Sequence, residues 1–436
     1  MDKLVIEGGR ALRGRVRTAG SKNAVLPILA ASLMTEAPLV IPNAPKLSDV
    51  GTMLDLLREL GSSAERDESG AVTVRSADVP ADKAGWENVR RMRGSIAVLG
   101  PLLGRTGRAV VSQPGGCVIG VRPIDVHLKG MQALGARVKV EHGYIVCEAP
   151  PGGLRGAEMY LGSSFGSSVL GTANVMMAAC FAKGRTVIHG AACEPEVTDL
   201  ADCLKKMGAK VSGQGSPRLE IEGVESLGGA TWPVIPDRIE AGTYLLAGAI
   251  TGGAVRVENC RPDHLTVLLD RLAAAGVPFS VGPDWIASMA RDVRDPERRA
   301  KPTDVTTLPY PGFPTDLQAQ WMALMTTATG VSVITENIYP DRYMHLAELL
   351  RLGANIRRQS TTAVVQGVDA LSGAQVTASD LRASAALVMA GLVAKGTTEV
   401  HRVYHIDRGY ERIDERLSAL GAQVERVNDR EEALKE

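Results

Sequence analysis

The chain has 436 residues, a length that exceeds one ordinary hydrophobic core and predicts two or three domains. It is 45% hydrophobic and 22% charged, and its 49 basic residues balance 49 acidic ones, so the charge does not favour a nucleic-acid partner. No apolar run is long enough to span a bilayer, and the first residues lack the pattern of a secretory signal. These features predict a globular cytoplasmic protein with no membrane and no nucleic-acid partner.

The cysteines and histidines show no metal-ligand or disulfide spacing. Six cysteines are scattered along the chain without a Cys-x-x-Cys pair, at positions 117, 147, 180, 193, 203 and 260. Such a distribution is typical of a protein from a reducing compartment. His127, His345, His401 and His405 form no ligand motif either, so we expect no metal site.

One helical signature recurs six times along the chain. In each copy an amphipathic helix ends in a sequence similar to Leu-Gly-Ala, at Gly61, Gly135, Gly208, Gly276, Gly353 and Gly421. Successive glycines are 74, 73, 68, 77 and 68 residues apart. A glycine can take the left-handed conformation that ends a helix, and a predicted strand follows each one. A period of about 70 residues is too long for a solenoid, so each copy is predicted to be a small αβ unit.

Each unit also contains a second predicted helix, rich in small and apolar residues. These helices cover residues 23–34, 95–104, 167–182, 241–250, 317–328 and 382–394. Helices that are apolar on every face are buried, and small residues let them approach one another closely. Strands rich in Val, Ile and Thr follow them, for example at residues 184–190, 252–260 and 396–406. The predicted class is therefore α/β (α+β), with inner helices, strands and outer helices in layers.

The units divide into two predicted domains. The sixth unit lacks its last strands, because only a charged tail follows its signature. Residues 4–25 align with 219–242 and 364–386, so residues 1–21 are predicted to complete the C-terminal unit. Three units would then form a domain at residues 22–233, and three a discontinuous domain at residues 1–21 and 234–436. Two chain connections of this kind would permit hinge closure over a substrate.

The most distinctive candidate for chemistry is the loop at residues 113–127, Gln-Pro-Gly-Gly-Cys-Val-Ile-Gly-Val-Arg-Pro-Ile-Asp-Val-His. Its glycines and prolines disfavour helix and central strand. Cys117 lies in this loop, and Arg122 follows five residues later; nearby positive charge favours the reactive thiolate. Most free cysteines are small buried hydrophobes. A loop of this composition is a poor place for burial, so we favour a reactive thiol.

Polar and charged residues begin the predicted inner helices. They are Lys22 and Asn23, Arg93, Ser164 to Gly166, Asp237 and Arg238, Asp316, and Arg382. The first turn of a helix presents unpaired N–H groups and partial positive charge, which attract anions. Any one of these arginines alone could be a solvated surface residue. Together with Arg122, Arg342 and Arg408 they predict a cationic cleft for phosphate and carboxylate groups.

Several motifs in this order resemble one known family. They are SKNAVLP (21–27), PGGCVIGVRPIDVH (114–127), SGQGSPRLEIEGVESLGG (212–229), PDRIEAGT (236–243), PGFPTDLQAQ (311–320), DRYMH (341–345), TASDLRASAALV (377–388) and YHIDRGYERI (404–413). Over essentially its whole length the chain resembles the UDP-N-acetylglucosamine 1-carboxyvinyltransferases, which are enolpyruvyl transferases. The resemblance implies two domains, each an inside-out α/β barrel of three repeated units around central helices.

The resemblance also implies a reaction. The enolpyruvyl group of phosphoenolpyruvate would pass to the 3-hydroxyl of UDP-N-acetylglucosamine by addition and elimination, with release of phosphate and no cofactor. This is the first committed step of peptidoglycan precursor synthesis. The resemblance implies that Cys117 donates the proton. It also implies that Asp316 contacts the sugar hydroxyl and acts as the base or proton relay. Lys22 and Arg408 complete the implied catalytic set.

The implied substrate-binding set is larger. Lys22 and Asn23 would meet phosphoenolpyruvate, whereas Arg342, Arg382 and Arg408 would hold carboxylate and phosphate groups. The other implied contacts are mostly with the nucleotide sugar, at Arg93, Arg122, Pro123, Ile124, Asp125, Val126, Gly162, Ser163, Ser164, Phe165, Asp316 and Ile338.

Three positions depart from the family pattern. Gly162 stands where the family often has lysine, Phe165 where it often has valine, and Cys193 where it often has arginine. The missing lysine removes a cation from the nucleotide site, so an enzyme that transfers enolpyruvate to UMP in a nucleoside-antibiotic pathway is the main alternative. A shikimate-pathway enolpyruvyl transferase should lack the loop of Cys117. An RNA-end-processing protein would need a more basic surface. A non-catalytic paralogue that binds a UDP-sugar is disfavoured by the joint presence of Lys22, Cys117, Asp316 and Arg408.

We predict that Cys117 is both the acid and the target of the phosphonate epoxide fosfomycin. Cys117→Ser should lose most activity because a hydroxyl is a far weaker acid than a thiol, whereas Cys117→Asp should retain part of it. The neighbouring cations should deliver the phosphonate to the thiol. Peptide mapping after treatment should find the adduct on Cys117, together with loss of activity. An adduct on another residue, or none at saturating drug, would contradict the prediction.

Overall fold

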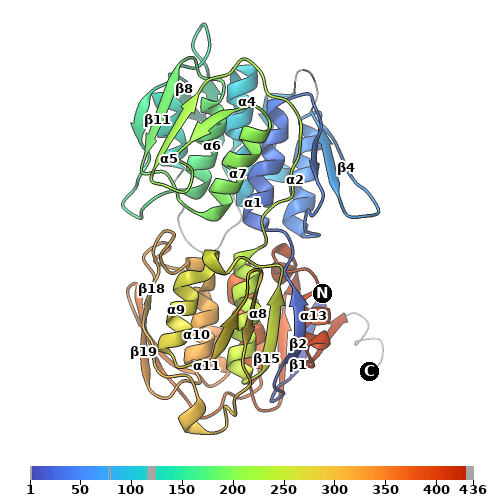
Figure 1. Cartoon of the computed structure of the whole chain (residues 1–436), viewed down its shortest axis with the longest axis vertical. Coiled ribbons are helices and arrows are strands. Elements are labelled where there is room, and N and C mark those ends of the chain that lie inside the picture. Colours follow the sequence, from blue (N-terminus) through green and yellow to red (C-terminus); the bar gives the residue numbers. More distant parts are fainter. Residues whose placement is uncertain (1, 77, 79, 115–123, 429–436) are drawn as a thin grey trace. The chain divides into compact units, whose positions relative to one another are not determined.

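The computed structural model describes residues 2–76, 78, 80–114 and 124–428. Cys117, Arg122 and Pro123 lie outside the described residues, so their predicted roles stay predictions. The chain forms two compact units (Figure 1). The middle unit comprises residues 20–114 and 124–235, and the split unit comprises residues 2–19 and 236–428. Among the described helices, none combines the length and the apolar character needed to cross a membrane.

The middle unit repeats one order of elements three times. Its inner helices are α1 (Lys22–Ala31), α4 (Leu99–Thr106) and α6 (Val169–Ala179), with the 3₁₀ turns η1 (Ser32–Met34) after α1 and η2 (Arg93–Val98) before α4. A strand follows each inner helix: β3 (Leu39–Ile41), β7 (Arg108–Ser112) and β11 (Arg185–His189). Next come the outer helices α2 (Ser48–Glu59), α5 (Asp125–Ala133) and α7 (Pro195–Lys206). Hairpins close the repeats: β4 (Ser63–Arg66) with β5 (Val72–Arg75), β8 (Arg137–Glu141) with β9 (Tyr144–Glu148), and β12 (Lys210–Ser212) with β13 (Arg218–Glu222).

The split unit follows the same order. Its inner helices are α8 (Arg238–Thr251), α10 (Gln318–Met325) and α12 (Leu381–Gly391), and η5 (Thr315–Leu317) precedes α10. The next strands are β15 (Ala254–Glu258), β19 (Val331–Thr335) and β23 (Thr397–His401), and the outer helices are α9 (Thr266–Ala274), α11 (Met344–Arg351) and α13 (Ile413–Ala419). The hairpins are β16 (Phe279–Val281) with β17 (Trp285–Ser288), and β20 (Asn355–Gln359) with β21 (Thr362–Gln366). In the sixth repeat β24 (Gln423–Asn428) pairs with β1 (Asp2–Glu7), which comes from the start of the chain.

A fourth strand links each sheet to its neighbour in a ring. It pairs in parallel with the strand that follows the inner helix. In the middle unit these strands are β6 (Lys83–Ala84), β10 (Glu158–Tyr160) and β14 (Ala230–Thr231), and in the split unit they are β2 (Arg13–Arg17), β18 (Val305–Thr306) and β22 (Gln375–Thr377). Each of these fourth strands follows the hairpin of one repeat and joins the sheet of the next repeat. After the third repeat of each unit the ring closes, because β14 joins the sheet of β3 and β2 joins the sheet of β15. The described chain thus holds six four-stranded sheets, three in each unit, which confirms the predicted barrel of repeated αβ units.

Two local predictions need correction. Residues 1–21 were expected to complete the sixth repeat, and β1 does so, but β2 pairs with β15 in the fourth repeat. The strand expected at residues 396–406 ends at His401. There Arg402 takes the left-handed conformation, with φ of 60°, and the 3₁₀ helix η6 (Val403–Arg408) follows. Val403 and Ile406 in this segment are both buried, and their spacing of three residues places them on one face of a helical turn but on opposite faces of a strand.

Glycines let the inner helices touch. A Cβ added to Gly100 in α4 would lie 2.1 Å from the carbonyl oxygen of Asn174 in α6, so the two backbones meet without side chains between them. The buried Asn174 side chain satisfies polar groups at this contact. Its Oδ1 accepts the Gly100 N–H at 2.8 Å, and its Nδ2 donates to the Ile96 carbonyl at 2.8 Å and to His127 Nδ1 at 3.0 Å. Figure 1 shows α1, α4 and α6 together inside the middle unit, with strands outside them.

A buried carboxylate anchors each chain connection between the units. Asp199 accepts hydrogen bonds from Trp232 Nε1 at 3.0 Å and from the Ile235 N–H at 3.2 Å. Glu240 accepts one from the Ala19 N–H at 2.8 Å and pairs with Arg416 at 2.8 Å. Burial raises the pKa of Asp199 to about 6 and that of Glu240 to about 7.

We predict opposite stability effects for two glycine-to-alanine substitutions. Gly100→Ala should lower the free energy of unfolding of the middle unit by about 1–3 kcal/mol, because the methyl group would overlap the backbone of α6. Gly51→Ala is the matched control, since Gly51 lies on the exposed side of α2 with open space around it. It should raise stability by about 0.5–1 kcal/mol through helix propensity. Denaturant unfolding followed by circular dichroism measures both, and equal effects would show that the helices are less closely packed than described.

Candidate functional site

Lys22 begins α1 in the middle unit and forms a buried ion pair. Its ammonium lies 2.8 Å from Oδ2 of Asp49, and both side chains are nearly inaccessible. Asp49 lies in the first turn of the outer helix α2, and Asn23 is half-buried next to Lys22. Asp49 was not predicted from the sequence. The signal that could have found it is an acidic residue in the first turn of an outer helix, where it can also interact with the helix dipole.

Arg93 and His127 lie near each other at the start of η2 and in α5. Burial lowers the pKa of His127 to about 3, and the positive charge of Arg93 adds to that effect. His127 is therefore neutral near pH 7. Its Nδ1 accepts the hydrogen of the Asn174 amide, so the ring proton is on Nε2. Asn174 thus sets the tautomer of this histidine, while burial, with a smaller contribution from Arg93, keeps the ring neutral.

Residues 124–126 and the turn at residues 162–166 lie around the starts of α5 and α6. Asp125 is exposed, whereas Ile124 and Val126 pack partly against the core. In the turn, Ser163 and Gly166 exchange backbone hydrogen bonds of 2.8 and 3.1 Å, and the Phe165 N–H donates to Ser163 Oγ at 3.2 Å. The helix α6 begins only at Val169, capped by Ser168. The prediction that residues 164–166 begin this helix is therefore wrong; they form a separate turn before it.

In the split unit, Asp316 lies between two buried arginines. Its Oδ1 is 2.7 Å from Arg342 Nη1, and its Oδ2 is 3.3 Å from Arg382 Nη2. Burial opposes the charge of each guanidinium, but neighbouring groups, including Asp316, outweigh that cost and raise the pKa of both arginines. The structure thus brings together three of the predicted residues, from η5, from the start of α12 and from the segment before α11.

A buried glutamate, which the sequence did not reveal, positions this cluster. The Glu336 carboxylate accepts hydrogen bonds from Thr307 Oγ1 at 2.7 Å and Thr315 Oγ1 at 2.8 Å. It also accepts the backbone N–H groups of Ile338 and Tyr339, each at 2.9 Å. Thr315, the residue before Asp316, also accepts a 3.0 Å hydrogen bond from Arg342. The Glu336 carboxylate therefore fixes both Thr315 and the turn that carries Ile338. No local pattern in the sequence distinguishes this glutamate from a solvated one.

Tyr410 supports Arg382 from the other side. Its hydroxyl accepts a hydrogen bond from Arg382 Nη1 at 3.2 Å and from Gln320 Nε2 at 3.3 Å, and it lies 2.9 Å from Thr243 Oγ1. These side chains come from the N-terminal parts of α8, α10 and α12 and from the segment after η6. Arg408, at the end of η6, is half-buried, and its charge adds to burial in lowering the pKa of His405.

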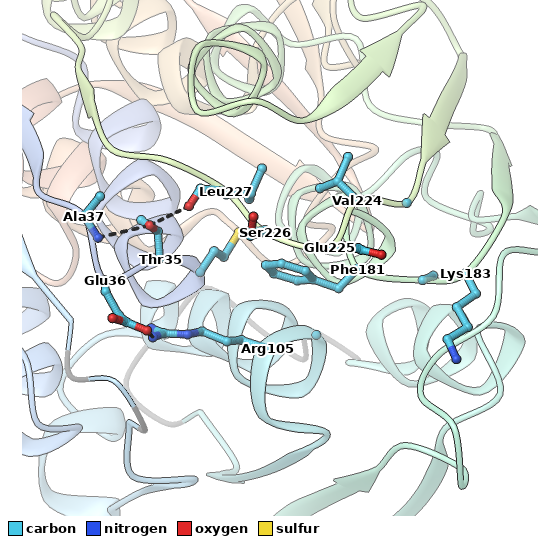
Figure 2. A pocket seen from close by; sticks show the side chains of 14 residues that line it. Thr35, Glu36, Ala37, Arg105, Phe181, Lys183, Val224, Glu225, Ser226 and Leu227 are labelled. Atoms are coloured by element: carbon cyan, nitrogen blue, oxygen red, sulfur yellow. Dashed lines mark hydrogen bonds and ion pairs between the residues drawn. The ribbon is translucent and has the colours of Figure 1, made fainter.

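A cavity of about 780 Å³ lies elsewhere in the middle unit (Figure 2). It is lined by residues from the C-terminal ends of α1, α4 and α6, including Met34, Arg105 and Phe181. Arg105 donates to the carbonyl oxygens of Leu33 at 3.0 Å and Asp78 at 2.8 Å. Lys22 and Arg93 stand at the opposite, N-terminal ends of these helices, and the cavity lining includes none of the predicted site residues.

Within residues 2–76, 78, 80–114 and 124–428, no group of three His, Cys, Asp or Glu side chains is placed to hold a metal ion. Burial raises the pKa of Cys147, Cys180 and Cys203 to about 12 and that of Cys260 to about 11. These thiols are therefore poor nucleophiles at neutral pH.

Comparisons with known proteins agree with one another. The family model for EPSP synthase (3-phosphoshikimate 1-carboxyvinyltransferase) matches residues 6–417. The chain is 51% identical over 431 residues to a UDP-N-acetylglucosamine 1-carboxyvinyltransferase of Akkermansia muciniphila, covering 98% of this chain and 99% of the relative. It is 53% identical over 431 residues to one from Anaeromyxobacter sp. (strain Fw109-5), with the same coverage.

Two solved structures have the same fold. The enolpyruvyl transferase NikO from Streptomyces tendae superposes with a TM-score of 0.87 at 25% identity, covering 98% of this chain and 99% of that one. EPSP synthase from Acinetobacter baumannii gives a TM-score of 0.73 at 17% identity, covering 98% of this chain and 100% of that one, and so supports the fold alone. The match to the family model, the identity over nearly the full length and the shared fold lead to one conclusion: the chain belongs to the enolpyruvyl transferase family, among the UDP-N-acetylglucosamine 1-carboxyvinyltransferases.

Proposed function

We propose that this protein transfers the enolpyruvyl group of phosphoenolpyruvate to the 3-hydroxyl of UDP-N-acetylglucosamine and releases phosphate. The observation that carries the proposal is Asp316, whose carboxylate is held between Arg342 and Arg382 in a chain about half identical to enzymes of this name. The product belongs to peptidoglycan precursor synthesis, and the reaction needs two small-molecule substrates and no cofactor.

The reaction consists of an addition and an elimination. In the addition, C3 of phosphoenolpyruvate gains a proton while the sugar oxygen attacks C2 and loses its own proton. In the elimination, C3 loses a proton, the C2–O bond to phosphate breaks, and the double bond forms again. The chemistry therefore needs an acid near C3, a base near the hydroxyl, and fixed cations for the phosphate and carboxylate groups.

The residues of each unit suit particular parts of this chemistry. We assign the base to Asp316, because two guanidinium groups fix the direction of its carboxylate oxygens. Lys22 has a fixed position because Asp49 holds it at the start of α1, where the helix end also favours an anion. Cys117 is the proposed acid, and Arg408 the proposed partner of a carboxylate group. Glu336 positions the segment of Ile338 and takes no direct part in the reaction.

The acceptor is tested by measuring phosphate release from phosphoenolpyruvate with three compounds in parallel. We expect turnover with UDP-N-acetylglucosamine, and none with UMP or shikimate 3-phosphate at the same concentration. Nuclear magnetic resonance of the product should show a new enol ether at the sugar 3-oxygen. Turnover with UMP but not with the UDP-sugar would instead support the nucleoside-antibiotic alternative, which the missing side chain at Gly162 keeps open.

The role of Asp316 is tested by Asp316→Asn. The amide keeps the size of the side chain but cannot accept the hydroxyl proton, so kcat should fall by about 10²- to 10⁴-fold. Asp341→Asn is the matched control, because Asp341 is exposed and pairs with Arg358 at 3.0 Å, one residue from Arg342. Circular dichroism should show both variants folded. If the two variants retain similar activity, Asp316 is not the base.

A further inference from the structure

Tyr160 fills the space beside the turn at residues 162–166. It ends strand β10, and 59% of its surface is exposed. A Cβ built on Gly162 would lie 2.2 Å from the Tyr160 hydroxyl oxygen, and one built on Gly190 would lie 2.8 Å from the ring. The ring thus lies across both glycines. Any side chain at position 162 would overlap Tyr160 unless the ring moved. The glycine at this position avoids that overlap.

Lys129 lies over the same ring. It is an exposed residue of α5, four positions after Asp125 and therefore one helical turn from the start of that helix. Its ammonium is 5.5 Å from the centroid of the Tyr160 ring, within the range of a cation–π contact. In the described part of the chain no carboxylate forms an ion pair with Lys129. Its charge therefore remains uncompensated, in contrast to that of Lys22, which Asp49 neutralises.

The Lys129 ammonium can leave the Tyr160 ring and bind a ligand instead. A cation–π contact at an exposed site is weaker than a charge-assisted hydrogen bond to a phosphate oxygen. The four-carbon stem of lysine is flexible, and its ammonium carries three donors. Tyr160 would therefore hold the ammonium next to the turn until a phosphate group arrives.

We propose that Lys129, held over Tyr160, supplies the cation for the diphosphate of the nucleotide sugar, in place of a side chain at residue 162. This rests on the proposed function, because it takes the turn at residues 162–165 as part of the nucleotide site. It makes Lys129 a specificity-determining residue: it should favour a nucleoside diphosphate over a monophosphate, and it should not recognise the base.

The test compares Lys129→Met and Lys129→Arg with Lys183→Met. Lys183 is an exposed lysine of the same unit that lines the cavity at the other end of the inner helices, so its substitution removes an equal charge far from the turn. Calorimetry measures binding of UDP, UMP and uridine, and steady-state kinetics gives KM for both substrates. Lys129→Met should weaken UDP binding about tenfold and uridine binding less than twofold, with KM for phosphoenolpyruvate unchanged. Lys129→Arg should recover most of the UDP affinity.

A second set of variants tests the replacement itself. Adding Tyr160→Ala and Gly162→Lys to Lys129→Met should restore UDP affinity to within about threefold of the original, because the new lysine has room once the ring is gone. Lys129→Met with Tyr160→Ala alone should not. The proposal is overturned if Lys129→Met binds UDP as tightly as Lys183→Met, or if it weakens uridine as much as UDP. Failure of the proposed function gives a different result: no phosphate release from the unmodified enzyme with UDP-N-acetylglucosamine.

Discussion

The close approach of three helices at the centre of each unit determines the rest of the structure. These helices are apolar around their whole circumference, so they are stable only when neighbours cover every side. Three sheets with outer helices provide that cover, and the fourth strand of each sheet ties one repeat to the next. Contacts such as Gly100 against Asn174 leave no space between the helices. A single repeat could not bury its own inner helix, so three are needed to complete a unit.

The same packing concentrates positive charge. The C-terminal ends of α1, α4 and α6 share one cavity, so these helices run in parallel and their N-terminal ends gather at the other end of the unit. In the split unit, the hydrogen bonds of Thr243, Gln320 and Arg382 with Tyr410 show that the N-terminal parts of α8, α10 and α12 also meet. Free N–H groups and cationic side chains then lie close together, which is unfavourable without anions. Asp49 and Glu336 provide buried negative charge, the half-buried Asp316 adds to it, and an anionic substrate would provide more.

The parts of this fold that depend on local sequence could be predicted, and those that depend on distant partners could not. The six glycines after amphipathic helices and the small residues of the inner helices revealed the repeats, because both patterns act within one element. The pairing of β2 with β15 escaped prediction because the two strands are distant in sequence. Asp49 and Glu336 have no distinguishing neighbours along the chain; only the packed structure shows what they hold. Gly162 was recognised as a departure, but its relation to Tyr160 and Lys129 is visible only in three dimensions. Cys117, Arg122 and Pro123 stay predictions.

The position of β1 has a consequence for the order in which the protein folds as it is synthesised. In the sixth sheet β1 lies between β23 and β24, and β2 pairs with β15. The first strands to leave the ribosome must therefore wait for partners that are translated more than 230 residues later, and the sixth sheet closes only when β24 has been made. The middle unit also closes its first sheet late, when β14 pairs with β3, but β14 ends at Thr231, so this unit is complete long before β24 is made. During translation the interior of the chain can thus become a folded body while both flanking segments of the split unit are still unpaired, and this leaves β1 as an open strand that a chaperone or a neighbouring nascent chain could contact first.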